Sequence, residues 1–488
     1  MRQLVIGALT ITLLVTLSHS ITSAESPEEI MEKRALGFVT TLQAGDSEAL
    51  FVYMNENWAP AKPGDNRDGR WTRIAGDLVK RHAQVEIVGV TVDQPYLLSV
   101  QTTEENGPAL SFIFEFEETP PYGIVQLGIE AGDRGPKADL PDFIMPPDAS
   151  TDQIVEALNI WFGTLEKQDK FSGTALIAWQ GKAIFTGAWG MADKRWDIPN
   201  NADTRFDLGS INKSFTKIAI GQLLLADKLT LDDPLSKHIS DYPNAEVAGK
   251  VTIRHLLEHS SGLGDIFTEE FFNSSKSLYE SPRDFFALFA DAPLQFEPGE
   301  SQSYSNAGFM VLGVIIENVS GQTYYEYVQQ HVFDRAGMTG AGFFRRDDPV
   351  ANVAEGYTQM RSEDEDGSWR SNAFMLPVRG NSAGSAQATV ADLLAFDNAL
   401  RTYKLLPPNY TAWYFGDDGA LTQAKLMDMP ERATVGTGIA GGAPGVSAAL
   451  ESDEDLAVII LSNYDAPIAE SVSRALYRPL KKALGETM

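Results

Sequence analysis

The sequence predicts an α+β protein built from two domains. The chain has 488 residues, which is more than one hydrophobic core usually organises. Its first part shows helical periodicity and then alternating strand patterns, whereas the remainder begins and ends with strand patterns that enclose a mainly helical region. Helices and strands are thus segregated along the chain, which is typical of α+β folds.

The first domain is expected over residues 25–132. From 26 to 83 apolar residues recur three and four positions apart, as in Ala35, Phe38 and Leu42, which indicates helices. Four strands follow, separated by turn-forming residues, with the sequences VEIVGVTV, YLLSVQTT, ALSFIFEF and IVQLGIE. Helices followed by a meander of strands resemble NTF2-like domains, and this resemblance implies a curved sheet that covers a layer of helices.

The second domain is expected over residues 153–488, after a linker. Residues 133–152 are rich in Pro, Gly and Asp, as linkers are. The sequence TALIAWQGKAIFTGAWG then reads as a hairpin with a Gln-Gly turn at 180–181. Near the other end, 456–463 predicts a buried strand and 466–485 an amphipathic helix. The sheet of this domain should therefore take strands from both of its ends.

Residues 1–24 have the pattern of an export signal. Arg2 precedes an apolar run from Leu4 to Leu17, and the sequence TSA that ends at Ala24 offers small residues for cleavage. The apolar run is too short to span a bilayer. We therefore expect a periplasmic or secreted protein without a stable membrane anchor, with an uncleaved N-terminal anchor as the alternative.

The composition excludes some partners. The chain has 39 basic and 67 acidic residues and a formal net charge of −28 at pH 7. A polyanionic partner would be repelled by this charge, so nucleic acid binding is not expected. The sequence contains no cysteine, which rules out disulfides and thiolate metal ligands. No metal ion and no cofactor is expected.

Two serine and lysine pairs lie in the stretch FDLGSINKSFTK, residues 206–217. Ser210 with Lys213, and Ser214 with Lys217, would each share one face of a helix. Ser210 would lie in the first helical turn, where unpaired N–H groups and the positive end of the helix dipole favour an oxyanion. Ser214 would lie one turn deeper, where its hydroxyl is expected to bond back to a backbone carbonyl.

Ser210 is therefore the candidate nucleophile, and Lys213 is its candidate base. A buried lysine can lose its proton because desolvation penalises the ammonium form, and the free amine can then take the hydroxyl proton as the serine attacks. The spacing alone is a weak signal, since a serine that merely caps a helix near a lysine also fits it.

Longer segments give this pair a context. TRFDLGSINKSFT is followed by LTLDDPLSKHI, VTIRHLLEHSSGLGD, EPGESQSYSNAGFMVLGVIIENVSG and GGAPGVSAAL. In this order they resemble the serine β-lactamase and penicillin-binding protein superfamily, above all its branch of class C β-lactamases, D-Ala-D-Ala carboxypeptidases, D-aminopeptidases and esterases. The resemblance covers roughly residues 155–485. It implies a β-lactamase/transpeptidase-like domain, with an antiparallel sheet flanked by helices and a mainly helical region.

The resemblance implies catalytic roles for four side chains. Its first motif, Ser-x-x-Lys, corresponds to Ser210 and Lys213, and its second, Tyr-x-Asn, to Tyr304 and Asn306. A phenol beside an ammonium group can relay a proton to the leaving group, and a carboxamide can hold the lysine and bind a substrate amide. A second match, YMN at 53–55, precedes any nucleophile and is expected to belong to a surface helix.

The third motif is where the chain departs from the superfamily pattern. That pattern has Lys or His, any residue and then Gly on a strand lining the site, but alignment on GAPG places Ile439, Ala440 and Gly441 there. The N–H of Gly442 could still join that of Ser210 in an oxyanion hole, which needs no side chain. Because no cation would face a substrate carboxylate, we expect poor recognition of penicillins and better turnover of uncharged esters or amides.

The sequence GNSAG at 380–384 matches the Gly-x-Ser-x-Gly nucleophile elbow of α/β-hydrolases. That elbow needs a preceding strand and, later in the chain, an acid and then a histidine. All six histidines precede Ser382, and Pro377 interrupts the required strand. The next helix is expected to start only at Thr389, in a capping box with Asp392. The elbow is therefore disfavoured.

The sequence HLLEH at 255–259 fits His-x-x-Glu-His. On a helix this pattern can place two imidazoles on one face to bind zinc, with the glutamate as base. The SSG that follows ends the helix at once, and no third ligand is evident. Capping or packing roles for both histidines are therefore favoured over a zinc hydrolase.

The resulting hypothesis is an exported serine hydrolase that forms an acyl-enzyme on Ser210. Its substrate would be a small ester, a D-amino acid amide or a peptide, with weak or no β-lactamase activity. The alternative from a different class is a catalytically degenerate binding protein for peptides or cell-wall fragments.

Overall fold

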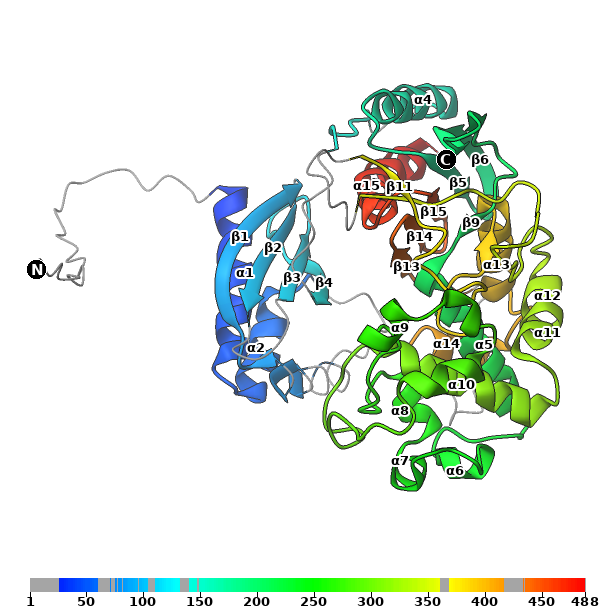
Figure 1. Ribbon diagram of the computed structural model, residues 1–488. Helices are drawn as coiled ribbons and strands as arrows, with labels where there is room; N and C mark the ends of the chain where they lie inside the picture. Colours follow the sequence, from blue (N-terminus) through cyan, green and yellow to red (C-terminus); the bar gives the residue numbers. More distant parts are fainter. Residues whose placement is uncertain are drawn as a thin grey trace, which may run out of the picture. The chain divides into compact units, whose positions relative to one another are not determined.

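The computed structural model divides the chain into two compact units, residues 1–135 and 136–488 (Figure 1). The residues that it describes run from 26 to 487, apart from 60–70, 72–74, 77, 81, 95, 104–109, 132–139, 147–148, 360–367, 417–432 and 434. The predicted export signal at 1–24 therefore lies outside the described residues. Within them, no helix has the length and apolar character needed to cross a membrane.

Two helices open the first unit. α1 (Pro27–Gln43) begins at a capping box in which Ser26 and Glu29 exchange hydrogen bonds. α2 (Ser47–Asn57) begins at Asp46, whose carboxylate accepts two backbone N–H groups of the first turn. Their apolar faces enter one core, as the three-and-four spacing predicts.

A four-stranded antiparallel sheet completes this unit and packs on α1. Its strands, in spatial order, are β1 (Glu86–Gln94), β2 (Leu97–Thr103), β3 (Leu110–Phe116) and β4 (Ile124–Ala131). The ring of Phe38 on α1 meets that of Phe114 on β3 edge to face, with centroids 5.4 Å apart. The predicted order of helices and strands is confirmed, and the resemblance to NTF2-like domains stays a prediction.

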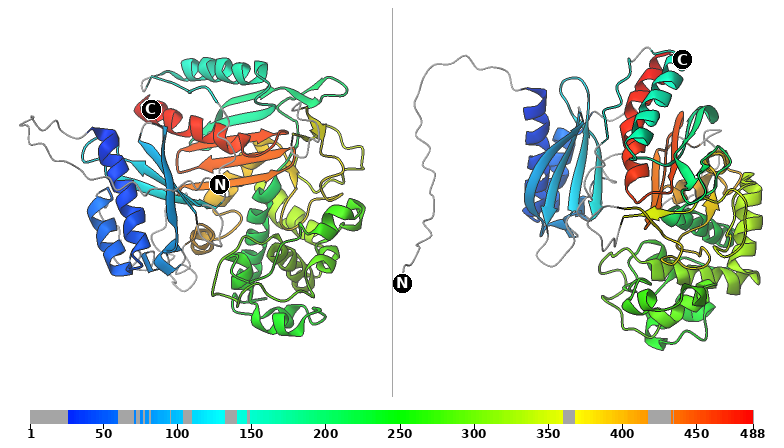
Figure 2. Two further views of the ribbon diagram at one scale, coloured as in Figure 1. Left: turned by 60° about the vertical axis from the view of Figure 1, so that its left-hand side comes forward. Right: turned by 45° about the horizontal axis from the view of Figure 1, so that its top comes forward.

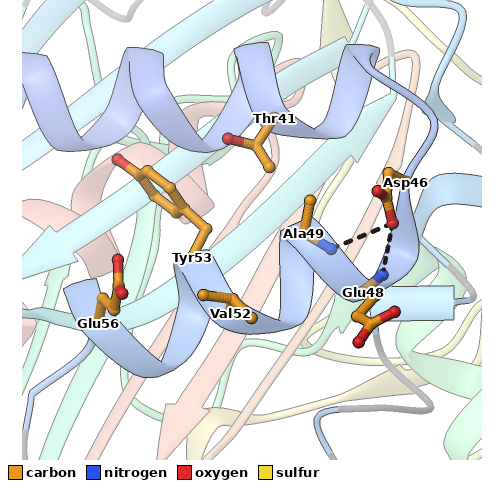
Figure 3. Close-up of a pocket in the computed structure, with 7 residues that line it drawn as sticks. All are labelled: Thr41, Asp46, Glu48, Ala49, Val52, Tyr53 and Glu56. Carbon is orange, nitrogen blue, oxygen red and sulfur yellow. Dashed lines mark hydrogen bonds between the residues drawn. The ribbon is translucent and has the colours of Figure 1, made fainter.

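A shallow groove of about 430 Å³ lies along α1 and α2 (Figure 3). Its lining residues are Thr41, Asp46, Glu48, Ala49, Val52, Tyr53 and Glu56. Two of its polar groups are already engaged, because Asp46 caps α2 and the Tyr53 hydroxyl donates to the Arg34 carbonyl at 2.9 Å. The YMN sequence thus belongs to a helix, as expected, and the groove contains none of the predicted catalytic residues.

The second unit is built on a five-stranded antiparallel sheet (Figure 2). Its spatial order is β13 (Thr437–Ala443), β14 (Val446–Ser452), β15 (Leu456–Ser462), β5 (Gly173–Trp179) and β6 (Lys182–Trp189). The predicted hairpin turn is confirmed: Gln180 and Gly181 both have positive φ, 48° and 76°, the conformation that tight hairpins favour. The pairing of β15 with β5 joins the two ends of this unit, as predicted.

Helices cover both faces of this sheet, which explains why the central strands β15 and β5 are mostly apolar. α4 (Thr151–Lys167) and α15 (Ile468–Thr487) pack on one face, where Ile177 and Ile460 point. α13 (Val390–Arg401) packs on the other face with the mainly helical region. α15 begins and ends two residues later than the helix predicted at 466–485.

The helical region lies between β6 and β13 in the sequence. Its α-helices are α5 (Asn212–Leu225), α6 (Leu235–His238), α7 (Ala245–Lys250), α8 (Ile253–Leu257), α9 (Glu269–Asn273), α10 (Asn306–Ser320), α11 (Tyr324–Val328), α12 (Asp334–Ala336), α13 and α14 (Pro408–Tyr414). Short 3₁₀-helices are η1 (Gly209–Ile211), η2 (Lys276–Leu278) and η3 (Pro282–Leu288), and η4 (Gln329–Phe333) is a π-helix. Short strands are β7 (Met191–Asp193), β8 (Ile198–Pro199), β9 (Phe206–Asp207), β10 (Tyr357–Thr358), β11 (Arg370–Ser371) and β12 (Gln387–Ala388).

The segment predicted as a linker, 133–152, differs in part from that expectation. Phe143 is buried in the core of the second unit, with its ring edge to face on Trp161 at 5.7 Å between centroids. The indole N–H of Trp161 donates to the carbonyl of Pro141 at 2.9 Å. The stretch around Phe143 is therefore an extended segment packed on α4, because a buried aromatic anchors it despite the high content of Pro and Asp.

Candidate active site

Ser210 lies where the chain passes from β9 through η1 into α5. This turn depends on Gly209, whose φ of +49° suits glycine. A Cβ atom on Gly209 would lie 2.7 Å from the backbone nitrogen of Gly442 on β13. The edge strand of the sheet therefore runs directly against the turn that carries the serine.

Two side chains converge on the hydroxyl of Ser210. The phenol of Tyr304 donates a hydrogen bond to Ser210 Oγ at 2.7 Å, and Lys213 Nζ lies 3.2 Å from the same oxygen. Lys213 Nζ also lies 4.7 Å from the centre of the Tyr304 ring. The two sequence motifs, 94 residues apart between Ser210 and Tyr304, thus meet at one oxygen atom.

Lys213 is buried and has two further partners. Its Nζ donates to Asn306 Oδ1 at 2.7 Å and to the backbone carbonyl of Ala383 at 2.7 Å. With Ser210 these oxygens surround the amine on three sides. These three contacts hold the amine in place beside the serine.

Burial lowers the pKa of Lys213 from its ordinary 10.5 to about 7, and the negative charge of Asp265 opposes this effect. Desolvation wins because the ammonium form loses more hydration energy than the nearby carboxylate restores. A substantial fraction of Lys213 is therefore the free amine near neutral pH, which is the form that can accept the proton of Ser210.

Tyr304 is presented from the loop that enters α10. Ser305 caps that helix by accepting the N–H of Gly308 at 3.0 Å, so Tyr304 stands just outside the first turn. Its ring stacks on the imidazole of His259 with centroids 4.6 Å apart. Burial raises the pKa of Tyr304, and its hydrogen bond to Ser210 partly offsets this. The phenol is thus protonated at neutral pH and available as a donor.

The second serine and lysine pair is engaged elsewhere. Ser214 is buried, and its hydroxyl acts on the phenol of Tyr414, where it opposes the rise in pKa that burial causes. Lys217 donates to the main-chain carbonyl of Tyr414 at 3.0 Å and lies 5.2 Å from the ring of Trp413. The second pair therefore faces α14 and not the groups around Ser210, and the expected back-bond of Ser214 stays a prediction.

β13 contributes backbone and an apolar side chain to the site. A Cβ atom on Gly441 would lie 2.0 Å from the carbonyl oxygen of Leu208 and 2.6 Å from the nitrogen of Ser210, so a side chain has no space there. The next residue, Gly442, has its nitrogen beside Gly209. Ile439 is partly buried and packs against the core of the helical region. The position aligned with the basic residue of the superfamily therefore holds an apolar side chain.

The GNSAG sequence supports the site with its backbone. Ser382 is fully buried, and its hydroxyl faces the sulfur of Met310 at 3.7 Å, so it cannot act as an exposed nucleophile. The carbonyl of Ala383 receives Lys213, and the N–H of Ser385 donates to the carbonyl of Gly209 at 3.1 Å. Thr389 and Asp392 form the predicted capping box of α13.

The two histidines of HLLEH have local roles. α8 ends at Leu257, and His259 follows in a backbone conformation with φ of 56°, so the two imidazoles do not share a helix face. Nδ1 of His255 accepts the N–H of Thr252 at 3.2 Å, and Nδ1 of His259 accepts that of Ser305 at 3.1 Å. Capping and packing are thus what these histidines do, and within the described residues no cluster of three potential metal ligands occurs.

Sequence reasoning did not connect two side chains and one carbonyl group with this site, although it expected a capping or packing role for His259. Asp265 accepts the side-chain N–H groups of Asn306, His259 supports the ring of Tyr304, and Ala383 receives Lys213. The first two lie in the segment VTIRHLLEHSSGLGD, which carried the family resemblance but from which no residue was assigned to the site. The contribution of Ala383 is a main-chain carbonyl, for which the residue type gives no signal.

Comparison with known proteins shows the family of this chain. The sequence profile of the Beta-lactamase family matches residues 152–481. The chain belongs to the β-lactamase family. It is 31% identical over 256 residues to Penicillin-binding protein 4* of Bacillus subtilis (strain 168), covering 50% of this chain and 55% of that protein. It is also 31% identical over 195 residues to Esterase EstB of Burkholderia gladioli, covering 37% of this chain and 48% of that protein. The chain thus spans about half the length of these curated relatives.

Solved structures match about two thirds of the chain. A penicillin-binding protein from Bacillus halodurans superimposes with a TM-score of 0.56 at 34% identity, over 65% of this chain and 98% of that one. A D-amino acid amidase from Ochrobactrum anthropi SV3 gives a TM-score of 0.54 at 24% identity, over 67% of this chain and 98% of that one, which is a likeness of fold. The predicted β-lactamase/transpeptidase-like fold is confirmed.

Proposed function

We propose that the chain is an exported serine hydrolase that cleaves esters or amides through an acyl-enzyme on Ser210. The observation that carries this proposal is the convergence of Lys213 and Tyr304 on one hydroxyl, 3.2 and 2.7 Å from Ser210 Oγ. A serine that merely caps a helix has no need of a buried amine and a phenol on the same oxygen.

The first half of the reaction transfers the acyl group to the enzyme. The free amine of Lys213 takes the proton of Ser210 as Oγ attacks the carbonyl carbon of the substrate. The N–H groups of Ser210 and Gly442 stabilise the oxyanion that forms. Tyr304 passes a proton to the departing alcohol or amine, and it regains one from the Lys213 ammonium. The products of this half are a Ser210 ester and the free leaving group.

The second half releases the acid. A water molecule attacks the Ser210 ester and passes a proton through Tyr304 to Lys213; the ester bond then breaks, and Lys213 returns that proton to Ser210 Oγ, which restores the hydroxyl and the free amine. Asn306 keeps Lys213 in place throughout and offers its carboxamide to a substrate amide. These steps require no metal ion and no cofactor.

The surroundings favour uncharged substrates. Ile439 occupies the position where the superfamily places a cation, and the chain carries a formal net charge of −28 at pH 7. A substrate carboxylate would therefore lack a counter-charge from this strand and would meet an overall repulsive field. Relatives named as an esterase and an amidase support small esters and D-amino acid amides as substrates, with weak or no turnover of penicillins.

A fluorophosphonate probe tests the nucleophile. The wild-type protein should become labelled at Ser210, and the variant Ser210→Ala should not be labelled at all. Labelling that persists in Ser210→Ala would exclude this nucleophile. A wild-type protein that stays unlabelled would favour the alternative, a binding protein for peptides or cell-wall fragments, for which the missing cation on β13 is the supporting observation.

A substrate panel then separates the hydrolytic activities. Short-chain p-nitrophenyl esters and D-amino acid amides should be hydrolysed faster than D-alanyl-D-alanine peptides and a chromogenic cephalosporin. Detection of the mature N-terminus after export, expected after Ala24, tests the location in the periplasm or medium.

A further inference from the structure

Asp265 stands behind the catalytic groups, in the loop that follows α8. Its two carboxylate oxygens lie 3.1 and 2.9 Å from Nδ2 of Asn306. On the far side of the same carboxamide, Oδ1 of Asn306 accepts Lys213 Nζ at 2.7 Å. A chain of contacts thus runs from Asp265 through Asn306 to the candidate base.

We propose that Asp265 is a positioning residue for the hydrolysis, which fixes the orientation of Asn306 and sets the charge balance at Lys213. This inference rests on the proposed function, because it assigns a role within the same site. Asp265 acts through Asn306 and Lys213, and no contact with the reacting atoms is required of it.

The orientation argument follows from the donors and acceptors of each group. An ionised carboxylate can only accept hydrogen bonds, so it must face the NH₂ end of the Asn306 carboxamide. The carbonyl end is then forced toward Lys213, where it accepts from the amine. An amide in place of Asp265 could face either end of the carboxamide, and the flipped Asn306 would turn its NH₂ group toward Lys213 and displace it.

The carboxylate is itself held in place. Its Oδ1 accepts the N–H of Phe267 at 3.2 Å, and its Oδ2 lies 3.5 Å from the backbone nitrogen of Asn306. The neighbouring Gly264 carbonyl accepts the hydroxyl of Ser305 at 2.8 Å. These contacts join the loop after α8 to the first turn of α10, so the carboxylate is oriented before any substrate binds.

The charge argument concerns the groups around Lys213. The amine of Lys213 is surrounded by the hydroxyl of Ser210, the ring of Tyr304, the Asn306 carboxamide, the Ala383 carbonyl, the imidazole of His259 and the carboxylate of Asp265. His259 is neutral at pH 7, because burial and the charge of Lys213 lower its pKa to about 4. Asp265 is therefore the group in this set that bears charge, and it favours the ammonium form of Lys213.

The test measures how fast a fluorophosphonate modifies Ser210 between pH 5 and pH 9. In Asp265→Asn the rate constant at pH 8 should fall about 10- to 100-fold, because the misplaced amine no longer meets the hydroxyl. The acidic limb of the profile should also move to lower pH, because without the carboxylate Lys213 loses its proton more easily. A purely structural role would lower the rate without moving that limb.

Matched variants complete the design. Asp232→Asn removes a carboxylate of the same type that is exposed and paired with Arg254, and it should leave both the rate and the limb unchanged. Asp265→Glu keeps the charge with a longer side chain, so its limb should stay near the wild-type position while its rate falls. This second variant keeps the inference testable if thermal unfolding shows that Asp265→Asn does not fold.

The outcomes separate this inference from the proposed function. A folded Asp265→Asn protein with the wild-type rate and limb would overturn the role of Asp265 and leave Ser210 as the nucleophile. Equal shifts of the acidic limb in Asp265→Glu and Asp265→Asn would also overturn the role of Asp265. The glutamate keeps the negative charge, so its limb should stay near the wild-type position. Labelling of the wild-type protein at a residue other than Ser210 would instead overturn the proposed function.

Discussion

The two serine and lysine pairs of residues 210–217 have the same spacing and share one helical stretch, yet their surroundings differ. The hydroxyl of Ser210 faces Lys213 and the phenol of Tyr304, whereas the hydroxyl of Ser214 acts on the buried phenol of Tyr414. The spacing brings a hydroxyl and an amine to one face of a helix. The chemistry depends on which groups other segments add to that face, and the catalytic arrangement is found only where α10, the GNSAG loop and β13 all arrive.

The serines give the largest expected contrast. Ser210→Ala should reduce kcat for a p-nitrophenyl ester by at least about a thousandfold, because no acyl-enzyme can form. Ser214→Ala should retain activity and lose about 1 kcal/mol of unfolding free energy, because a buried hydroxyl beside Tyr414 is removed. Steady-state kinetics and urea unfolding check both variants. Equal losses of activity in the two variants would remove the distinction drawn between the pairs.

The lysines sharpen the same comparison. Lys213→Arg should lower kcat/KM by roughly 10²- to 10⁴-fold, because a guanidinium group keeps its proton and cannot serve as a base. Lys217→Arg should change kcat/KM little, since Lys217 contacts a carbonyl and an aromatic ring on α14 that a guanidinium group can also contact. Substantial activity in a folded Lys213→Arg protein would contradict the role of Lys213 as base.

The sequence predicted some elements of the second unit better than others. The hairpin at β5 and β6 and the buried strand β15 follow from alternation and from an apolar run, which are local signals. The packed segment around Phe143 did not follow, because its burial depends on Trp161, 18 residues later, and composition alone favoured a linker. Local pattern therefore identified the elements, and it failed where a single long-range contact decides the conformation.

The residues of the site also divide into those that the sequence predicted and those that it did not. Ser210 and Lys213 were predicted from residue type and position on the helix, and the family resemblance supported this pair and added Tyr304 and Asn306. Asp265 and the Ala383 carbonyl were not found, because they act on Lys213 from segments distant in the sequence, and a carbonyl group is common to every residue type. Supporting contacts of this kind become visible once the fold brings the segments together.

A substitution at Gly441 can disrupt the contact between β13 and the turn that carries Ser210. Gly441→Ala would place a methyl group 2.0 Å from the carbonyl oxygen of Leu208, so β13 must move away from the turn that carries Ser210. We expect kcat to fall about 100-fold, because the N–H of Gly442 leaves the oxyanion position. Gly438→Ala on the same strand is the control, because no atom lies within 4 Å of its Cβ position. Similar kinetics for both variants would mean that the contact of β13 with the turn has no catalytic role.

The pH dependence gives a smaller effect that reports on Lys213 directly. Because burial lowers the pKa of Lys213 to about 7, the amine is mostly protonated at pH 6 and mostly free at pH 8. The rate of Ser210 modification should therefore rise about tenfold between these values and then level off. A modification rate that is low at acidic pH and high at basic pH is what a base that must be deprotonated gives. A rate that falls across this interval would show that the charged lysine is the reactive form.

The smallest expected effect tests the apolar position on β13. Ile439→Lys introduces the cation that the superfamily pattern places there, and kcat/KM for a substrate bearing a carboxylate should rise about tenfold relative to an uncharged ester. Ile439→Met, which changes shape but not charge, should leave this ratio unchanged. The ratio is more informative than either rate, because loss of the packing of Ile439 against the helical core lowers both rates together. If Ile439→Lys leaves the ratio unchanged, residue 439 does not face the substrate, and the preference for uncharged substrates must arise from the acidic surface of the protein instead.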